Sequence, residues 1–280
     1  MVDVEVVDVR VGALTFRTRV AGPEAGDVVL LLHGYPQTSW EWRAQIAALA
    51  DAGYRAVAPD QRGYSPGARP ESVDGYTQDA LASDVLGIAD ACGATRFHLV
   101  GHDWGAMLAW HVAVWHPVRL RSLTIVSVPH PAALARALHD PSSDQADRFF
   151  YIPMFKDHRE GELFGSADQM RAIFDASGLR GHAVDEHVEV LSEPGALETA
   201  THWYRAFDYD AGDLGPVVDV PTLFVWSTDD PALGPDAARW TRDHVRGPYR
   251  FEVFEGAPHW IPEAEPDRLS ALLLEHIAST

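Results

Sequence analysis

The chain has 280 residues, of which 46% are hydrophobic, with 41 acidic and 22 basic side chains. This length is enough for one large α/β domain or for a core with an inserted cap. The formal net charge of −19 argues against nucleic acid or an anionic membrane surface as a partner. The single cysteine, Cys92, excludes an internal disulfide. Because the acidic start Met1–Glu5 does not resemble a signal peptide and no apolar run approaches a membrane span, we expect a soluble, cytoplasmic protein.

The first part of the chain alternates between strand and helix patterns. The alternating segments Val4–Val9 and Leu14–Val20 predict a hairpin, and the apolar run Val28–Leu32 is typical of a strand buried on both faces. Ser39 and Thr77 are suitable N-caps for two helices. The later elements predicted in this part are helices over 40–52, from the Thr77 cap to 92 and over 104–115, and strands over 54–58, 96–100 and 120–128.

The alternation stops between Pro129 and about Val220, where the pattern is mostly helical and rich in aromatic and turn residues. It then resumes with a strand over 222–226, a helix over 235–245, a strand over 249–254 and a helix over 267–278. The sequence therefore predicts an α/β core of residues 1–128 and 220–280, with a mostly parallel sheet flanked by helices. Residues 129–219 are predicted to form a helical cap over the carboxyl ends of the strands, where ligands bind in such sheets.

The stretch from Gly101 to Gly105 joins a predicted strand to a predicted helix and carries Asp103 at its centre. A strand that turns sharply into a helix brings backbone segments close together, so glycine is favoured on both sides of the turn. The turn raises Asp103 above the carboxyl end of the sheet and directs the Trp104 N–H toward developing negative charge. This is the setting of a nucleophile elbow, with aspartate in place of serine. The alternative is a glycine-rich turn with a capping aspartate.

A second G-x-S-x-G match surrounds Ser65 but does not predict a nucleophile. The residue that follows the nucleophile supplies a backbone N–H, and here that residue is Pro66, which has none. No helix pattern follows Ser65 either.

Two partners should follow an elbow nucleophile in chain order, first an acid and then a histidine. Asp229 and Asp230 come directly after one predicted strand, and His259 comes after the next. Both loops lie at carboxyl ends of strands, where Asp103 is also placed. We favour Asp230 as the acid and expect Asp229 to cap the local turn. The alternative is that His259 is an ordinary histidine of a loop that precedes a helix.

Histidines and acids elsewhere do not form a closed ligand set for a metal. His98 with His102, and Asp185 with His187, are the pairs considered. We predict no metal and no cofactor.

These residues together resemble the α/β-hydrolase fold family, in its epoxide hydrolase and haloalkane dehalogenase branch. The resemblance covers nearly the whole chain and is carried by the motifs His33-Gly34-Tyr35-Pro36 and His102-Asp103-Trp104-Gly105, with the later Asp230 and His259. It implies that Asp103 is the nucleophile, His259 the base and Asp230 the residue that orients it. It also implies an oxyanion hole of the Tyr35 and Trp104 N–H groups, and a cis Tyr35–Pro36 bond.

Two tyrosines of the predicted cap suit the opening of an epoxide, because the alkoxide that forms needs a proton donor. By resemblance, these are Tyr204 in Trp203-Tyr204-Arg205 and Tyr151 in Phe149-Phe150-Tyr151. The alternative is that both are ordinary aromatic residues of the cap core. The residues expected to contact the substrate are His33, Phe150, Phe155, Trp203 and Trp260.

The sequence therefore predicts a cofactor-independent epoxide hydrolase, monomeric or homodimeric, that converts an apolar or aromatic epoxide to a vicinal diol. The first alternative is a haloalkane dehalogenase, although Tyr35 stands where many of those enzymes place asparagine. An anionic substrate is disfavoured, because Trp104 occupies the position at which fluoroacetate-type dehalogenases place arginine. The second alternative is a non-catalytic binding protein of the same fold.

Overall fold

The computed structural model describes residues 3–207 and 217–280, so residues 1–2 of the predicted core and 208–216 of the predicted cap lie outside the described residues. Within the described residues, eight strands form one sheet in the order β1-β2-β4-β3-β5-β6-β7-β8. β2 is antiparallel to both of its neighbours, and the other pairs are parallel. The strands are β1 (Glu5–Val11), β2 (Leu14–Ala21), β3 (Val28–Leu32), β4 (Arg55–Pro59), β5 (Phe97–His102), β6 (Leu120–Val126), β7 (Thr222–Ser227) and β8 (Tyr249–Phe254).

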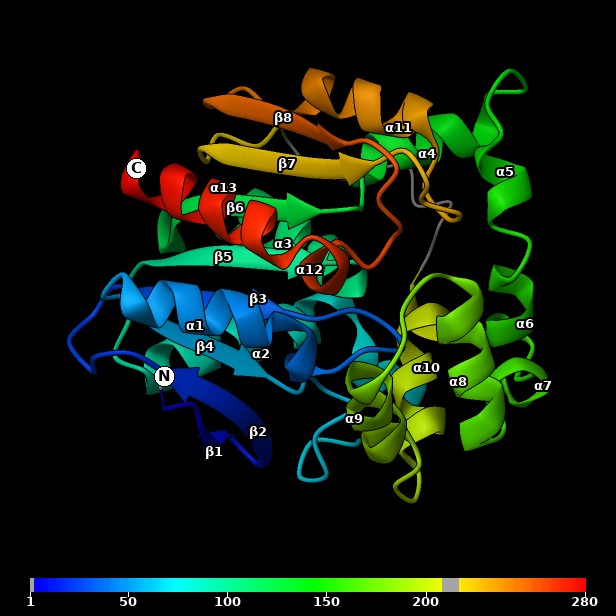
Figure 1. Ribbon diagram of the computed structural model, residues 1–280, viewed down its shortest axis with the longest axis horizontal. Coiled ribbons are helices and arrows are strands. Elements are labelled where there is room, and N and C mark those ends of the chain that lie inside the picture. Colours follow the sequence, from blue (N-terminus) through cyan, green and yellow to red (C-terminus); the bar gives the residue numbers. More distant parts are fainter. Residues whose placement is uncertain (1–2, 208–216) are drawn as a thin grey trace.

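Helices cover both faces of the sheet (Figure 1). One face carries α1 (Arg43–Asp51), α12 (Ile261–Ala264) and α13 (Pro266–Ala278), and the other carries α2 (Gln78–Ala91), α3 (Trp104–Trp115) and α11 (Pro235–Trp240). Short 3₁₀ turns complete the core at η1 (Ser39–Trp42), η2 (Val73–Tyr76), η3 (Pro117–Arg119) and η4 (Thr241–His244). No described helix is both long and apolar enough to cross a membrane.

The central strand β3 is buried along its whole length, as its continuous apolar run predicts. Leu30 and Leu32 pack in the core on the α2–α3 side, whereas Val29 and Leu31 pack on the α1–α13 side. Full burial of each such side chain stabilises the fold by about 1.5–3 kcal/mol. This double packing holds the ends of β3 and its neighbour β5 rigidly, and both strands lead into the candidate site.

The helix expected over 40–52 is divided in the structure, and Ser39 does not cap it. Thr38 is the N-cap, and its side chain accepts a hydrogen bond from the Trp40 N–H at 3.4 Å. Ser39 instead directs both its N–H and its hydroxyl to Asp60, at 2.9 and 2.7 Å. The first turn is therefore the 3₁₀ helix η1, and α1 begins only at Arg43. The cap predicted at Thr77 is confirmed, since its side chain accepts from the Ala80 N–H.

The described part of the chain between β6 and β7 is helical. Its helices are α4 (Pro131–His139), α5 (Gln145–Arg148), α6 (Ile152–Lys156), α7 (Gly161–Phe164), α8 (Ala167–Ala176), α9 (His182–Leu191) and α10 (Ala196–Ala206). α4 packs against α11 and η4, beside the sheet. Helices α6–α10 lie beyond the carboxyl ends of the strands (Figure 1). We call α5–α10 the helical layer.

Candidate active site

Asp103 stands alone between the last residue of β5 and the first residue of α3, with φ 49° and ψ −121°. This backbone conformation is unfavourable for a residue with a side chain and costs of the order of 1–3 kcal/mol. The flanking glycines permit the turn, because a Cβ at Gly101 would lie 2.3 Å from the Gly105 carbonyl oxygen. A Cβ at Gly105 would lie 2.1 Å from the carbonyl oxygen of Leu32. The structure thus has the sharp strand–turn–helix that the glycine spacing predicts.

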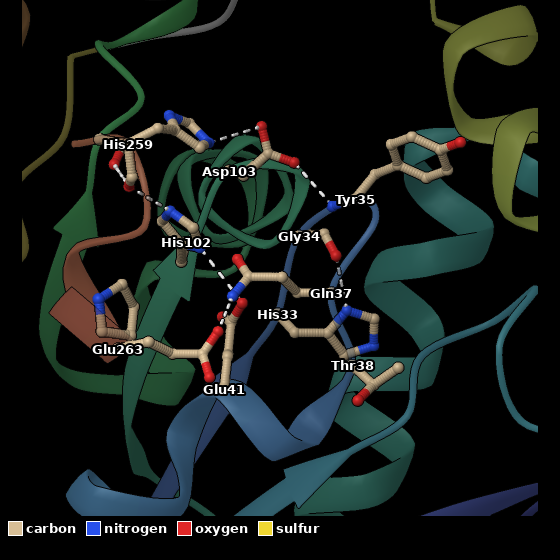
Figure 2. Close-up of polar contacts among 12 residues, drawn as sticks. His33, Gly34, Tyr35, Gln37, Thr38, Glu41, His102, Asp103, His259 and Glu263 are labelled. Atoms are coloured by element: carbon tan, nitrogen blue, oxygen red, sulfur yellow. Dashed lines mark hydrogen bonds and ion pairs between the residues drawn. The ribbon is translucent and has the colours of Figure 1, made fainter. Parts of the chain in front are cut away.

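The loop after β3 forms the opposite wall of this turn. The Tyr35 N–H donates a hydrogen bond to Oδ1 of Asp103 at 2.8 Å (Figure 2). The Tyr35–Pro36 peptide bond is cis, as expected. Gly34 is required here for a reason that the sequence alone did not reveal. A Cβ at this position would come within 2.3 Å of the Asp103 Cβ.

His259 lies between two carboxylates. Its Nδ1 is 2.7 Å from Oδ2 of Asp230, and its Nε2 is 3.6 Å from Oδ2 of Asp103. The second oxygen of Asp230, Oδ1, accepts the backbone N–H groups of Ala232 and Leu233 at 2.8 and 3.0 Å. Asp229 is exposed and does not reach the imidazole; its backbone N–H donates to a carbonyl of the adjacent loop. The structure therefore brings Asp103, His259 and Asp230 together.

The charges of these groups depend on one another. Burial opposes ionisation of Asp103, but the hydrogen bond and charge of His259 outweigh it and lower the pKa of the carboxyl group below its usual range. Burial likewise opposes protonation of His259, but Asp230 and Asp103 outweigh it and raise its pKa to about 10. These opposite shifts favour an imidazolium at His259 beside an Asp103 carboxylate in the free site.

A cavity of about 290 Å³ opens above Asp103 and His259, and its other walls are almost entirely apolar. It is lined by Tyr35, Pro36, Asp103, Phe150, Tyr151, Phe155, Phe164, Ile173, Ser177, Tyr204, Pro231, Ala232, His259 and Trp260. A small apolar molecule placed here would meet the carboxylate at the base of the cavity and the helical layer on its other sides.

Both tyrosines expected from the helical layer line this cavity, with ring centroids 6.5 Å apart. Burial raises the pKa of Tyr151 far above its usual range, and the negative charge of Asp103 adds to this effect. Its hydroxyl therefore keeps its proton. The Tyr204 ring stacks on Phe155, with centroids 4.2 Å apart, and meets the Trp104 ring edge-on at 4.8 Å. These contacts fix the orientation of its ring.

Two of the residues expected at the substrate lie elsewhere, which corrects the sequence interpretation. His33 is buried beneath the β3 loop, where its Nε2 accepts the Gln61 N–H at 3.0 Å and its Nδ1 donates to the Gly34 carbonyl at 2.9 Å. Trp203 faces the sheet and donates from its indole N–H to the Arg62 carbonyl at 2.8 Å. Each side chain donates to a loop carbonyl, and neither lines the cavity.

The other expected contacts lie on the cavity, together with residues that the sequence analysis missed. Phe155 and Trp260 are buried in its wall, whereas Phe150 is 75% exposed and stands at its mouth. The residues missed are Pro36, Phe164, Ile173, Ser177, Pro231 and Ala232. Pro36 belongs to the motif His33-Gly34-Tyr35-Pro36, which could have indicated it. The other five residues carry no motif, and only the helical pattern around Phe164 and Ile173 could have suggested a buried face.

The remaining candidates have structural partners. Ser65 is buried, donates from its hydroxyl to the Asp60 carbonyl at 2.5 Å and accepts the Arg17 N–H at 2.9 Å. His98 pairs with Ser122, Asp185 with Arg171, and His187 with Thr38 and Glu263. Among the described residues, no group of three or more histidines, cysteines and acids is placed to hold a metal ion.

Comparison with known proteins identifies the family. The model of the alpha/beta hydrolase fold family matches residues 27–266. The chain belongs to the α/β-hydrolase fold family. Epoxide hydrolase A of Mycobacterium tuberculosis is 35% identical to this α/β hydrolase, over 92% of each chain. The AB hydrolase superfamily protein YfhM of Bacillus subtilis is 32% identical, over 96% of each.

A solved structure described as novel epoxide hydrolases of the same superfamily from metagenomes of hot environments has a TM-score of 0.87 to this α/β hydrolase. It is 27% identical and covers 99% of this chain and 100% of the other. The predicted fold class and family are confirmed.

Proposed function

We propose that this α/β hydrolase is an epoxide hydrolase that opens its substrate to a vicinal diol through a covalent ester on Asp103. The observation that carries the proposal is the pairing of a carboxylate at the base of an apolar cavity with two tyrosines on the same cavity wall. Its relatives named as epoxide hydrolases support the same substrate class.

In the first step, an oxygen of the Asp103 carboxylate attacks an epoxide carbon. Oδ1 of Asp103 is held by the Tyr35 N–H, and this contact fixes the plane of the carboxylate. The carbon–oxygen bond of the ring breaks as the ester bond forms, and the leaving oxygen carries the negative charge. Tyr151 and Tyr204 donate hydrogen bonds to that oxygen, and a phenol proton neutralises it. The burial-raised pKa of Tyr151 keeps its hydroxyl protonated until the alkoxide, which is a stronger base than a phenolate, develops.

In the second step, His259 acts as the base. Esterification removes the Asp103 charge that helps to raise the pKa of His259, so the imidazolium gives its proton to the phenolate left by the first step. The neutral imidazole can then accept a proton from water. Asp230 holds Nδ1 of His259 protonated, which leaves Nε2 as the acceptor. The resulting hydroxide adds to the Asp103 carbonyl carbon, and the N–H groups of Tyr35 and Trp104 stabilise the oxyanion. Collapse of this intermediate releases the diol and restores Asp103.

We also propose a domain division, a substrate class and a cellular location for this enzyme. The domain division into a core of 1–128 and 220–280 and a cap of 129–219 accounts for a cavity between the sheet edge and the helical layer. The apolar and aromatic wall supports an apolar or aromatic small-molecule epoxide as substrate. The acidic composition and single cysteine support a cytoplasmic protein without a nucleic-acid or membrane partner, acting as a monomer or homodimer.

The activity is tested with a panel of alkyl and aryl epoxides beside matched chloro- and bromoalkanes. We expect diol formation without halide release, and no turnover by Asp103→Ala. Halide release without diol formation would establish a haloalkane dehalogenase instead. A wild-type protein that binds these compounds and turns over none would establish a binding protein.

The mechanism is tested by a single turnover in heavy-oxygen water with enzyme in excess. The ester route places a carboxylate oxygen in the diol, so the first diol is unlabelled and the Asp103 peptide gains the heavy oxygen. Labelled diol with an unlabelled Asp103 peptide would rule out the ester and leave Asp103 as a general base or an electrostatic residue.

A further inference from the structure

Glu41 is buried behind the proposed catalytic groups, although it touches none of the reacting atoms. Its side chain is 0% exposed, and its Oε2 lies 3.3 Å from Nδ1 of His102. The other ring nitrogen of His102, Nε2, lies 3.0 Å from the backbone carbonyl oxygen of His259 (Figure 2). His102 therefore connects a buried acid to the loop that carries the proposed base.

The His259 carbonyl determines where one hydrogen lies. A carbonyl oxygen can only accept, so Nε2 of His102 carries a hydrogen and donates it. The Ser127 hydroxyl donates to the same oxygen at 3.1 Å. These two donors, from the ends of adjacent parallel strands, fix the backbone at His259.

The contact between Nδ1 of His102 and Glu41 is compatible with two protonation states of the pair. In the first, His102 is an imidazolium and Glu41 a carboxylate. In the second, His102 is neutral, its Nδ1 has a lone pair, and the carboxylic acid of Glu41 donates the hydrogen bond. Both pairs have the same heavy-atom positions, so the neighbouring charges distinguish them.

A second buried acid, Glu263, lies in the same region and is ionised. Its carboxylate accepts hydrogen bonds from Arg43, Gln37 and His187. Nδ1 of His187 accepts the Thr38 N–H, so its Nε2 must be the nitrogen that donates to Glu263. The hydrogen bonds and charges of His187 and Arg43 outweigh burial and lower the pKa of Glu263.

The surrounding charges favour the neutral pair. Burial raises the pKa of Glu41 well above its usual range, and the charges of Glu263 and Asp103 add to this effect. Together they outweigh the backbone hydrogen bond from Gly34 and the charge of Arg43, which lower the pKa. Burial also lowers the pKa of His102 to about 3, helped by His259, whose ring centroid is 4.9 Å away. An imidazolium at His102 would lie directly beside the imidazolium at His259.

We propose that Glu41 is a neutral carboxylic acid that donates a hydrogen bond to Nδ1 of His102, and that it thereby positions the His259 base. The hydrogen bond holds His102 in the Nε2–H form that anchors the His259 carbonyl. Glu41 is thus a positioning residue for the second step, and this role rests on the proposed function of His259.

The matched variants are Glu41→Gln and Glu41→Met, which have similar length and differ in their ability to donate. A glutamine amide donates to Nδ1 as a carboxylic acid does, whereas methionine cannot. Glu41→Gln should keep the rate of ester hydrolysis near that of the wild type. Glu41→Met should lower it by about tenfold or more, because a small displacement of a catalytic group carries such a cost. The alkylation step should change little, so Glu41→Met should accumulate the Asp103 ester, measured by intact-protein mass during rapid mixing.

The histidine itself provides a readout that is independent of turnover. Nitrogen-15 NMR of the imidazoles, assigned by the signals lost in His102→Asn, should show His102 with a hydrogen on Nε2 only, in the wild type and in Glu41→Gln. A wild-type His102 protonated on both nitrogens would overturn the proposal, whether or not the protein proves to be an epoxide hydrolase. Loss of ester hydrolysis by a folded Glu41→Gln as large as that by Glu41→Met would also overturn it, because Glu41 would then act as a carboxylate.

Discussion

Oδ2 of Asp230 lies 2.7 Å from Nδ1 of His259, while Oδ1 of the same carboxylate accepts two backbone N–H groups, those of Ala232 and Leu233. The loop therefore determines which atom of residue 230 faces the imidazole. An asparagine at this position would keep its oxygen on the two N–H groups and present its NH₂ to Nδ1.

In Asp230→Asn, Nδ1 of His259 should therefore accept a hydrogen bond from the asparagine NH₂. The hydrogen of the neutral imidazole then moves to Nε2. Nε2 can no longer accept a proton from water, as the second step requires. We expect kcat to fall by about 10⁴-fold, as for the corresponding change in a serine-protease triad. The control is Asp229→Asn, whose exposed side chain should leave kcat within about twofold. Steady-state kinetics of both variants measure this, and the reverse order would move the orienting role to Asp229.

His259→Gln should separate the two steps. Glutamine cannot activate water, but Asp103 can still attack, so the ester should accumulate on the Asp103 peptide and be detectable by mass spectrometry. The double variant with Asp103→Ala should form no adduct. A folded His259→Gln that never carries substrate mass would contradict the covalent mechanism.

Gly34→Ala should abolish most activity, because its Cβ would meet the Cβ and Oδ1 of Asp103 at 2.3 and 2.5 Å. The displacement moves the Tyr35 N–H away from the carboxylate, and we expect a loss of about 100-fold or more in kcat/KM. Gly161→Ala is the matched control, since no atom lies within 4 Å of its added Cβ. Equal activity of the two variants would show that the close approach at Gly34 is unimportant.

Tyr151→Phe and Tyr204→Phe should each slow formation of the ester, by about tenfold or more, and the double variant by about 10²–10⁴-fold, the usual contribution of a general acid. Hydrolysis of an ester already formed should be unaffected. Stopped-flow measurement of the alkylation phase tests this, with Tyr249→Phe, at the opposite end of the sheet in β8, as the control. An unchanged alkylation rate in the double variant would remove both tyrosines from the reaction.

His130 should make stability depend on pH. Burial, and the His244 ring stacked on it at 4.8 Å, lower its pKa to about 3. A depressed pKa means that the unfolded state binds the proton more readily. The stability from His130 is therefore present above the unfolded pKa of about 6.5 and is lost as the pH falls. At pH 5 this lowers the free energy of unfolding by about 2 kcal/mol.

The test is urea unfolding of the wild type and of His130→Asn at pH 7 and pH 5. His130 Nδ1 accepts the Ala132 N–H as an N-cap, and asparagine can replace that hydrogen bond. We expect the wild type to lose more stability than His130→Asn over this interval. Equal losses would show that His130 is not buried in its neutral form.

Much of the fold could be predicted because its signals are local. The apolar run Val28–Leu32 has no polar face, and such a strand must be covered on both sides. The glycines beside Asp103 are required by backbone contacts a few residues away, so their spacing already defines the turn. Ser39 shows the limit of local signals. Its side chain was expected to cap a helix, but it donates a hydrogen bond to Asp60, a carboxylate 21 residues away in the chain.

The sequence by itself determined the chain order of Asp103, an acid and His259, because each follows a strand and parallel strands end at the same edge of a sheet. The sequence favoured Asp230 over Asp229, but only the tertiary structure placed the Asp230 carboxylate against His259, turned Trp203 toward Arg62, and buried Glu41 behind His102. These outcomes depend on side chains far apart in the chain that compete for the same donors, acceptors and buried space. The outcome of this competition depends on how the side chains pack in three dimensions. It cannot be predicted from the periodicity of the sequence or the spacing of its motifs.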